Sequence, residues 1–411
     1  MGDAKDKMKA IHYQDFVNKL DDIFQTYERK TAIVEYVSEE NVRKYSYGEL
    51  FEYAMKVKLA LARLNVLPRE RTAVLARPSA QSAMLLLALS YLGYTAVLTD
   101  VSLPAEEQNR LIHFTEPSAI ITTEELAPSL DEELRTSLPI LCFQGEEGLR
   151  LWNSEPREWR KSAIPGSEDV IAISFTSDTT GSVKSAEITY QAMAYSAIAC
   201  AHYAEYGVKT RFLHILPQTH VAGYAMLFIN FLQGSEMAFV PEISTAGLAM
   251  GLRKYEPTHL FMIPKDYETI QKEMEEEIAK CSAGVRLLFH SCKALSGTVR
   301  RLTGIRMKHL MRHFYAPTFG RNIEVIGCGT APCADETARF FQDLGICFLN
   351  VYGSTEESFP ICSGNVSREK YKPTAGDRVE ELTLRLRDAF LDLRESVCQF
   401  SQEEKAGGIV L

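Results

Sequence analysis

The sequence predicts an α/β fold made of two packed βαβ-type subdomains. Two observations indicate this class: short runs of apolar and β-branched residues recur along the 411-residue chain, and helical patterns separate consecutive runs. A third is the composition, because 46% hydrophobic and 24% charged residues are typical of a chain that buries a core over most of its length. Parallel strands need crossover connections, so this alternation favours βαβ units.

The expected strands share short apolar or β-branched runs. They cover residues 72–76, 96–99, 119–122, 170–176, 212–216, 259–263, 323–326 and 347–351. The expected helices share an apolar face at helical spacing. They cover residues 49–64, 79–92, 190–206, 267–280 and 334–344. The polar stretch 144–169, which holds both tryptophans, connects two such blocks, so we expect subdomains at about residues 1–165 and 166–365.

Charge and composition exclude several classes of partner. The formal net charge is −9, so no overall positive field attracts nucleic acid. The nine cysteines include no C-x-x-C pair, which favours reduced thiols and a cytoplasmic location. The N-terminal residues lack the apolar core of a secretory signal. The longest apolar stretch, residues 82–98, is interrupted by Ser90 and Gly93, so we expect at most peripheral contact with a membrane.

Four polar loops follow strands of the expected sheets, and open α/β sheets bind their ligands at such strand ends. The loops cover residues 176–184, 217–223, 327–332 and 351–356. The last two are separated by one helix and one returning strand, so a right-handed crossover brings both to the same sheet edge. We therefore expect one crevice lined by all four loops.

The residues of these loops suit a bound nucleotide. Hydroxyls, backbone N–H groups and Lys184 in the first loop can wrap a polyphosphate, although the loop is not a Walker A motif. Glu356 can ligate Mg²⁺, and Tyr352 can stack on an adenine. His220 opens a helix and can donate to a substrate carboxylate, while Gly223 leaves room for a ligand. Each loop also has an ordinary alternative: a solvated turn, an exposed carboxylate or a partly buried histidine.

In order and spacing, the four segments resemble the acyl-adenylating superfamily of acyl-CoA synthetases, luciferases and amino-acid adenylation domains. Its phosphate loop, (Y/F)-T-S-G-(S/T)-T-G-x-P-K-G, is similar to residues 175–185. Its L-P-x-x-H-x-x-G, G-G-A-P and Y-G-x-T-E segments are similar to residues 216–223, 329–332 and 352–356. Residues 45–50 and 93–100 look like its T-Y-x-E-L and G-A-x-x-x-P-L-D stretches, so the resemblance runs from about residue 45 to the end of the chain.

This resemblance implies a two-step ligase that uses ATP and Mg²⁺. A carboxylic acid would form an acyl-adenylate, and a thiol of coenzyme A or of a carrier protein's phosphopantetheine would then take the acyl group. The residues carried over to the β- and γ-phosphates are Thr176, Ser177, Thr179, Thr180, Gly181 and Lys184. Those carried over to the adenine and the α-phosphate are Gly329, Thr330, Ala331, Asn350, Tyr352, Gly353 and Thr355.

The resemblance also implies roles at the reacting groups. Glu356 would hold the Mg²⁺, and His220 and Gly223 would border the acyl carboxylate. The catalytic set would be His220, Thr355, Glu356 and Lys184, acting largely by positioning and charge stabilisation.

Residues 284–289 and the basic helix that follows are most like those of long-chain fatty acyl-CoA synthetases. A fatty acyl-AMP ligase and an aryl or medium-chain CoA ligase are alternatives. A third alternative is a non-catalytic module, descended from the ligases, that binds a nucleotide or an acyl group.

Departures of two kinds from the superfamily pattern, in residue type and in length, favour weak activity. Asp178 stands where the superfamily has glycine, and repulsion between its carboxylate and a phosphate about 4 Å away costs roughly 1 to 4 kcal/mol. Thr330 replaces the second glycine of G-G-A-P. Members also continue into a mobile C-terminal domain with a catalytic lysine. We therefore expect residues 366–411 to begin a truncated, β-rich third subdomain, and the chain alone to be slow at adenylation and poor at thioesterification.

A basic segment runs from Lys293 to Arg321, with seven Lys or Arg, two histidines and no acid. A solvated basic helix and a patch that meets an anionic membrane or the phosphates of coenzyme A are both consistent with it. His309 and His313 lie four residues apart without the glutamate of H-E-x-x-H, so we expect no zinc site there.

Overall fold

The computed structural model describes residues 13–143, 148–153, 169–177, 183–331, 333–353, 362–364 and 377–378. Its larger sheet has nine strands, six of them parallel, with antiparallel strands at both edges. In spatial order these are β16 (Asp377–Arg378), β15 (Cys362–Gly364), β14 (Cys347–Tyr352), β13 (Val325–Cys328), β12 (His259–Met262), β10 (Arg211–His214), β11 (Glu236–Phe239), β1 (Thr31–Tyr36) and β2 (Val42–Ser46).

The smaller sheet has seven strands, again with a parallel centre and antiparallel edges. In spatial order these are β7 (Leu149–Asn153), β6 (Ile140–Phe143), β5 (Ala119–Thr122), β3 (Arg71–Leu75), β4 (Thr95–Thr99), β8 (Val170–Ser177) and β9 (Val183–Thr189). Every strand expected from the sequence is present in one of the two sheets, with ends shifted by at most two residues. The predicted α/β class is therefore confirmed.

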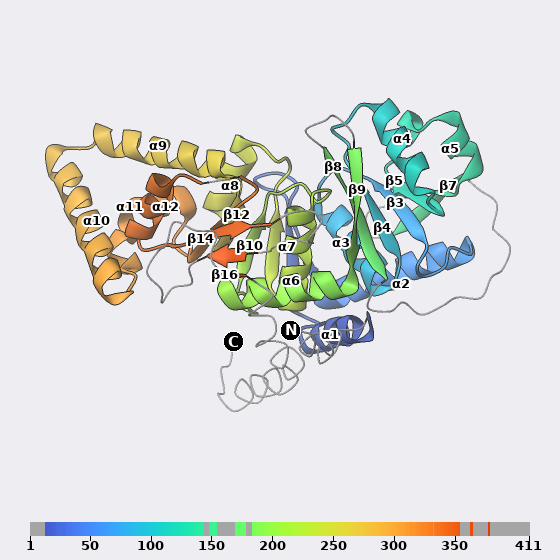
Figure 1. The fold of residues 1–411 in the computed structure, drawn as a ribbon, viewed down its shortest axis with the longest axis horizontal. Coiled ribbons are helices and arrows are strands. Elements are labelled where there is room, and N and C mark those ends of the chain that lie inside the picture. The colour runs from blue at the N-terminus through green and yellow to red at the C-terminus, as the bar shows by residue number, and fades with distance from the viewer. Residues whose placement is uncertain are drawn as a thin grey trace, which may run out of the picture.

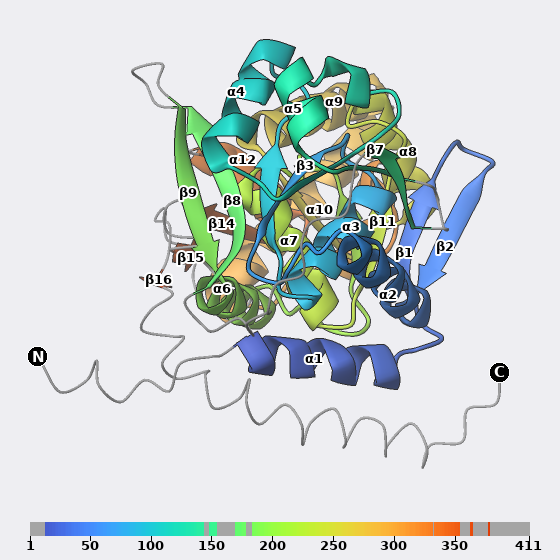
Figure 2. The ribbon, with the colours of Figure 1, turned by 90° about the vertical axis from the view of Figure 1, so that its right-hand side faces the viewer.

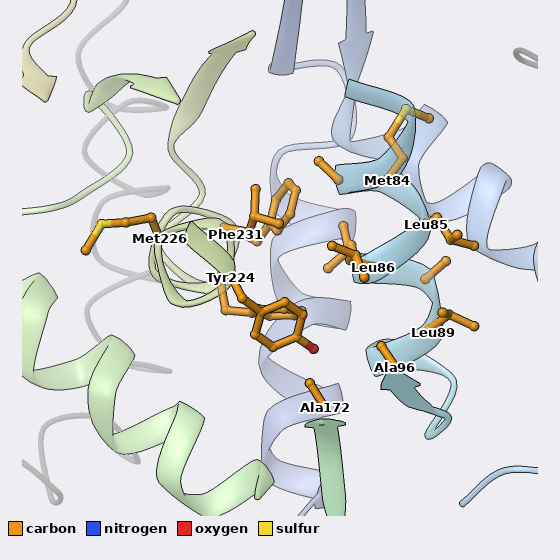
Figure 3. Close-up of a cluster of buried hydrophobic side chains, with 14 of the residues drawn as sticks. Met84, Leu85, Leu86, Leu89, Ala96, Ala172, Tyr224, Met226 and Phe231 are labelled. Carbon is orange, nitrogen blue, oxygen red and sulfur yellow. The ribbon is translucent and has the colours of Figure 1, made fainter. Parts of the chain in front are cut away.

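Two apolar helices, α3 (Ala80–Tyr91) and α7 (Val221–Leu232), lie between the sheets (Figure 1). All twelve residues of α7 are buried, as are residues 82–90 of α3, and a helix that is apolar all round belongs in a core. Figure 3 shows Leu86 of α3 and Tyr224 of α7 in the space between the two helices. This central layer joins the two sheets into one body.

Further helices cover the outer face of each sheet and complete the layers (Figures 1 and 2). The smaller sheet packs on α4 (Ala105–Thr115) and α5 (Glu132–Ser137). The larger sheet packs on α8 (Thr245–Tyr255), α9 (Pro264–Lys280), α11 (Lys308–Phe319) and α12 (Asp335–Asp343). A further helix, α10 (Ala283–Thr303), packs on α9, α11 and α12. The remaining helices are α1 (Tyr13–Thr26), α2 (Tyr47–Arg63), α6 (Tyr190–Tyr203) and a short 3₁₀ turn (Ala127–Ser129).

Local sequence signals explain where two of the core helices begin. The Ser46 hydroxyl accepts from the backbone N–H of Glu49, whose carboxylate accepts from the backbone N–H of Ser46. Ser79 and Ser82 form the same reciprocal arrangement at the start of α3. These caps satisfy N–H groups that the first helical turn leaves without a partner.

The division between the sheets differs from the subdomain boundary expected near residue 165. Strand β1, from the first part of the chain, pairs with β11 through Ile33 and Met237. Strand β8, from the second part, pairs with β4 through Ala96 and Ala172. Each sheet thus contains strands from both halves of the chain. The order of residues along the chain does not decide this, because a strand can pair with any sheet edge that has no partner yet. Of the β-rich subdomain expected at 366–411, the structure describes only Asp377–Arg378, as an edge strand.

None of the helices within the described part of the chain is both long and apolar enough to span a bilayer.

Candidate active site

The loop before α7 is fastened to the core by a buried amide. Gln218 is 3% exposed. Its Nε2 donates to the Ser79 carbonyl at 2.9 Å, and its Oε1 accepts from the Ser82 hydroxyl at 2.5 Å. Both serines belong to the capped start of α3, so the loop and this helix are locked together. We did not single out Gln218 from the sequence; its position between the proline and the histidine of the motif is the only signal.

His220 is the last residue of this loop, and it is exposed. It is the N-cap residue of α7, with φ −86° and ψ 144°, and its side chain makes no capping bond to the helix. Its backbone N–H donates to the Pro217 carbonyl at 3.2 Å, which holds the turn closed. The imidazole is therefore presented at the end of a buried helix, where the positive end of the helix dipole favours an anion such as a carboxylate.

Gly223 has a different role from the one expected. A Cβ at this position would lie 2.0 Å from the Pro217 carbonyl oxygen, so the space beside Gly223 is filled by main chain rather than left for a ligand. The Gly223 carbonyl also accepts from Nε2 of His214, a buried residue of β10, at 3.1 Å. Burial lowers the pKa of His214 to about 4, so His214 is a neutral structural donor at neutral pH. His214 was not identified from the sequence.

A hydrogen bond joins the segment that was expected to bind polyphosphate to the loop before α7. The Ser174 hydroxyl of β8 donates to the Thr219 carbonyl at 3.0 Å, which sets β8 beside the loop that carries His220. The expected loop 176–184 is in part a hairpin, because Thr176 pairs with Lys184 and Ser177 pairs with Val183. Lys184 is exposed on β9. Two of the four predicted loops are thus neighbours, although they belong to different sheets.

The other two loops meet at the ends of β13 and β14. Cys328 pairs with Asn350, and a Cβ on Gly329 would lie 2.9 Å from the Val351 carbonyl oxygen. Gly329 is therefore required by close backbone approach. Thr330 has φ +72°, a left-handed conformation that is strained for a β-branched residue. The chain thus keeps the backbone shape typical of glycine at a position where it has threonine.

A second pair of contacts holds the start of this turn. The Tyr267 hydroxyl donates to the Gly327 carbonyl at 2.8 Å. A hydrogen bond between the two thiols raises the pKa of Cys328, which is buried as well, and lowers the pKa of Cys333 on the far side of the turn. Hydrogen bonds therefore hold the turn that contains Gly329 and the strained Thr330 at its start and at its end.

The remaining predicted residues divide into two groups. Asn350 and Gly353 are half-buried at the end of β14, and Ala331 is exposed beside Thr330. For Thr176, Ser177 and Tyr352 the structure describes the backbone only. The predictions that lie outside the described residues are Asp178, Thr179, Thr180, Gly181, Thr355 and Glu356. The part of the chain that is described contains no cluster of three or more possible metal-ligating side chains, and the predicted Mg²⁺ ligand Glu356 is not in that part.

Strands β10, β13 and β14 are parallel members of one sheet, so the loops that follow them leave the sheet on the same side, at the carboxyl-terminal ends of the strands. The hydrogen bond from Ser174 adds the hairpin of the second sheet to that side. The loop of His220, the hairpin of Lys184 and the turn of Gly329 thus lie at carboxyl-terminal strand ends, which we call the rim, and Lys184 and His220 are exposed there. A lysine on a hairpin and backbone N–H groups suit phosphate oxygens, and the histidine suits a carboxylate.

Comparison with known proteins agrees with this arrangement. The model of the AMP-binding enzyme family matches residues 20–393. A long-chain-fatty-acid–[acyl-carrier-protein] ligase of Arabidopsis thaliana, AEE15, is 28% identical over 253 residues, which are 52% of this chain and 34% of the ligase. A 2-succinylbenzoate–CoA ligase of Bacillus cereus is 22% identical over 78% of this chain and 56% of its own length. The chain thus spans only about a third to about half of these relatives.

Solved structures show the same fold. A benzoate CoA ligase from Burkholderia xenovorans superimposes with a TM-score of 0.65 and 17% identity, over 88% of this chain and 65% of the ligase. A long-chain-fatty-acid-CoA ligase from Archaeoglobus fulgidus gives 0.64 and 15%, over 85% of this chain and 66% of the ligase. The resemblance inferred from the four segments is confirmed at the level of the family. The chain belongs to the AMP-binding enzyme family.

Proposed function

We propose that this protein activates a carboxylic acid with ATP and passes the acyl group to a thiol. In the first step the carboxylate oxygen attacks the α-phosphorus of ATP, forming an acyl-adenylate and releasing pyrophosphate. In the second step a thiol attacks the acyl carbon and AMP leaves. Family membership supports this class of reaction. The observation that carries it is the Ser174–Thr219 hydrogen bond, which joins the polyphosphate hairpin to the loop that presents His220.

The rim offers matching groups for each part of the reactants. Lys184, opposite Thr176 on the hairpin, supplies a positive charge for the β- and γ-phosphates. His220 at the start of α7 supplies a donor for the acyl carboxylate. The turn formed by Gly329, Thr330 and Ala331, next to Asn350, supplies an edge for the adenine. Glu356 is the proposed protein ligand of Mg²⁺, which would supply positive charge to offset that of the phosphates.

We propose a long-chain fatty acid as the substrate. The curated relatives named for long-chain fatty acids, from Arabidopsis, Drosophila and rat, support this choice, as does the 284–289 segment. The acceptor is coenzyme A or the phosphopantetheine of a carrier protein, since relatives of both kinds match. Relatives that act on 2-succinylbenzoate support an aryl acid as the second candidate.

The alternative of a non-catalytic binding module rests on Asp178. A carboxylate in place of the glycine of the phosphate loop opposes the phosphate oxygens by charge. If this repulsion dominates, the protein binds an acyl group or a nucleotide and does not form the adenylate. The Asp178→Gly variant tests whether this repulsion exists, because the variant should bind ATP more tightly if the loop faces phosphate.

ATP–pyrophosphate exchange with saturated fatty acids of several lengths, benzoate and 2-succinylbenzoate tests the proposal. Exchange with a fatty acid, reduced at least about tenfold by Lys184→Ala, is expected, because one charge-assisted contact to phosphate contributes at least this much. Lys44→Ala, an exposed lysine on the edge strand β2, is the matched control and should leave the rate unchanged. ATP binding without exchange for any acid would favour the module, and neither binding nor exchange would contradict the site.

A further inference from the structure

A long acid-free segment stands apart from the candidate active site. Between Glu277 and Glu324 the chain has nine Lys or Arg and three His, and neither Asp nor Glu. This occurs in a protein whose formal net charge is −9. The segment contains α11, which packs on the outer face of the larger sheet, and α10, which packs on α9, α11 and α12. Figure 1 shows α10 along the outer edge of the molecule, with its N-terminal end next to the end of α9.

The inward face of α10 accounts for its attachment to the fold. Phe289 and Ser296 are buried, the Lys293 ammonium lies 4.0 Å from the centre of the Phe340 ring, and Arg300 pairs with Asp343 at 3.1 Å. These contacts lie on one side of the helix. The side that carries the exposed leucines takes no part in them.

The outward face carries large apolar side chains. Leu288, Leu295 and Leu302 recur every seven residues, which places them in one line along the helix. Ile305 follows the Gly304 cap that ends the helix, and Leu302 and Ile305 are 79% and 61% exposed. We call Leu295, Leu302 and Ile305 the outer apolar patch. All three of these large apolar side chains are more than half exposed, so we take this end of α10 as a candidate interaction surface.

Charges around the outer apolar patch are positive. Arg301 is exposed beside Leu302, and the half-buried Arg306, whose guanidinium donates to the Glu324 carbonyl at 3.4 Å, follows Ile305. The nearest acids are already engaged, since Asp343 pairs with Arg300 and Arg301, and Glu324 pairs with Lys308. The acidic residues 275–277 are near the end of α9 that lies next to the N-terminal end of α10, and Glu275 also lines a hollow with Lys293 of α10. The C-terminal half of α10 therefore offers an apolar line edged by cations.

We propose that the outer apolar patch with Arg301 and Arg306 docks the protein on an anionic lipid bilayer. Apolar side chains would enter the boundary between headgroups and acyl chains, and the cations would face the anionic headgroups. The charge argues against a second copy of the chain, because two acid-free helices would oppose cation to cation. The proposed contact is peripheral, because it is made by side chains on the outside of α10 and just after it. The inference does not depend on the nucleotide chemistry proposed above.

Flotation of the full chain with vesicles tests the proposal. Vesicles of phosphatidylcholine alone are compared with vesicles containing about 30% phosphatidylserine, at about 0.05 and about 0.5 M salt. We expect at least tenfold stronger partitioning onto the anionic vesicles, and a loss of most of this difference at high salt. Equal partitioning onto both vesicles, or none onto either, would overturn the proposal.

Variants separate the apolar and the charged contributions. The triple variant Leu295→Gln, Leu302→Gln and Ile305→Gln should weaken binding at least about tenfold, since each exposed side chain loses its burial in the bilayer. Arg301→Gln with Arg306→Gln should weaken it by about the same factor, and only on anionic vesicles. The matched control replaces two exposed residues elsewhere, Leu59→Gln and Phe114→Gln. An equal loss in the control would contradict the proposal.

A gain of signal keeps the test independent of how the triple variant folds. Leu302→Trp should show a blue-shifted emission on anionic vesicles and quenching by lipids brominated in their acyl chains. Emission that stays unshifted in the presence of these vesicles would overturn the proposal. So would a dimer in sedimentation equilibrium that the triple variant abolishes, because the surface would then belong to a second copy.

Discussion

Two loops of the candidate active site follow parallel strands of the same sheet, yet they are held in different ways. Each loop contains a glycine whose Cβ, if it had one, would come too close to a backbone carbonyl oxygen. This oxygen belongs to Pro217 for Gly223 and to Val351 for Gly329. The loop of His220 is further fixed by buried side-chain hydrogen bonds from Gln218 and His214. The turn after β13 is also held by side chains, through the Tyr267 hydroxyl and the two thiols, but it carries a strained residue, Thr330 at φ +72°. The first loop is thus rigid by satisfaction of its polar groups, and the second stores strain at the proposed adenine edge.

The largest effect is expected from Gly223→Ala. The new methyl group would lie 2.0 Å from the Pro217 carbonyl oxygen, so the His220 loop must move or the start of α7 must shift. We expect a loss of about 3 kcal/mol in the free energy of unfolding, measured by urea denaturation. Gly284→Ala in α10 is the matched control, because nothing lies within 4 Å of the position of its Cβ. The control should be neutral or slightly stabilising, and equal losses in both would show that Gly223 is not tightly packed.

The pH dependence of stability tests the role of His214. Its pKa is lowered by burial from 6.5 to about 4, so the unfolded chain binds a proton at higher pH than the folded protein does. The stabilisation from His214 is therefore complete above about pH 6.5 and is lost as the pH falls towards 4. Between pH 7 and pH 5 we expect a loss of about 2 kcal/mol from this residue.

The control for this prediction is His214→Gln, which keeps a donor near the Gly223 carbonyl and removes the titration. Burial also lowers the pKa of His259, so a part of the slope remains in both proteins. The prediction concerns the difference between the slopes of the two urea titrations. If the variant has the same slope as the unchanged protein, His214 is not the group that titrates.

A smaller effect is expected from Gln218→Ala, which removes two buried hydrogen bonds to the start of α3. The unfolding free energy should fall by about 1 to 2 kcal/mol, because the Ser82 hydroxyl and the Ser79 carbonyl lose a partner. The KM for the acid in the exchange assay should rise, since the loop that presents His220 loosens. Gln14→Ala, which breaks an exposed hydrogen bond to Asn18, is the control and should change neither quantity.

The smallest effect is expected at the strained turn. Thr330→Gly relieves a left-handed conformation and should raise the unfolding free energy by about 1 kcal/mol, after the entropy cost of glycine is subtracted. Thr303→Gly, at the last helical position of α10, should instead lower it by a similar amount. A loss of stability in Thr330→Gly would mean that the turn is not strained, and the contrast between the two loops would disappear.

The amino-acid sequence by itself determined the α/β class, eight of the sixteen described strands and the four loops that follow strands. It did so because strand and helix periodicities are local and because the motif residues retain their spacing, as at Leu216 to Gly223. Only the tertiary structure decided that β1 joins β11 and that β8 joins β4, since any open parallel edge accepts a strand of this kind. It also decided what surrounds Gly223 and Gln218, because the carbonyl and the serines they meet are brought there by the packing of α3 against α7. A pattern of residue types records which groups are present, and packing decides which of them touch.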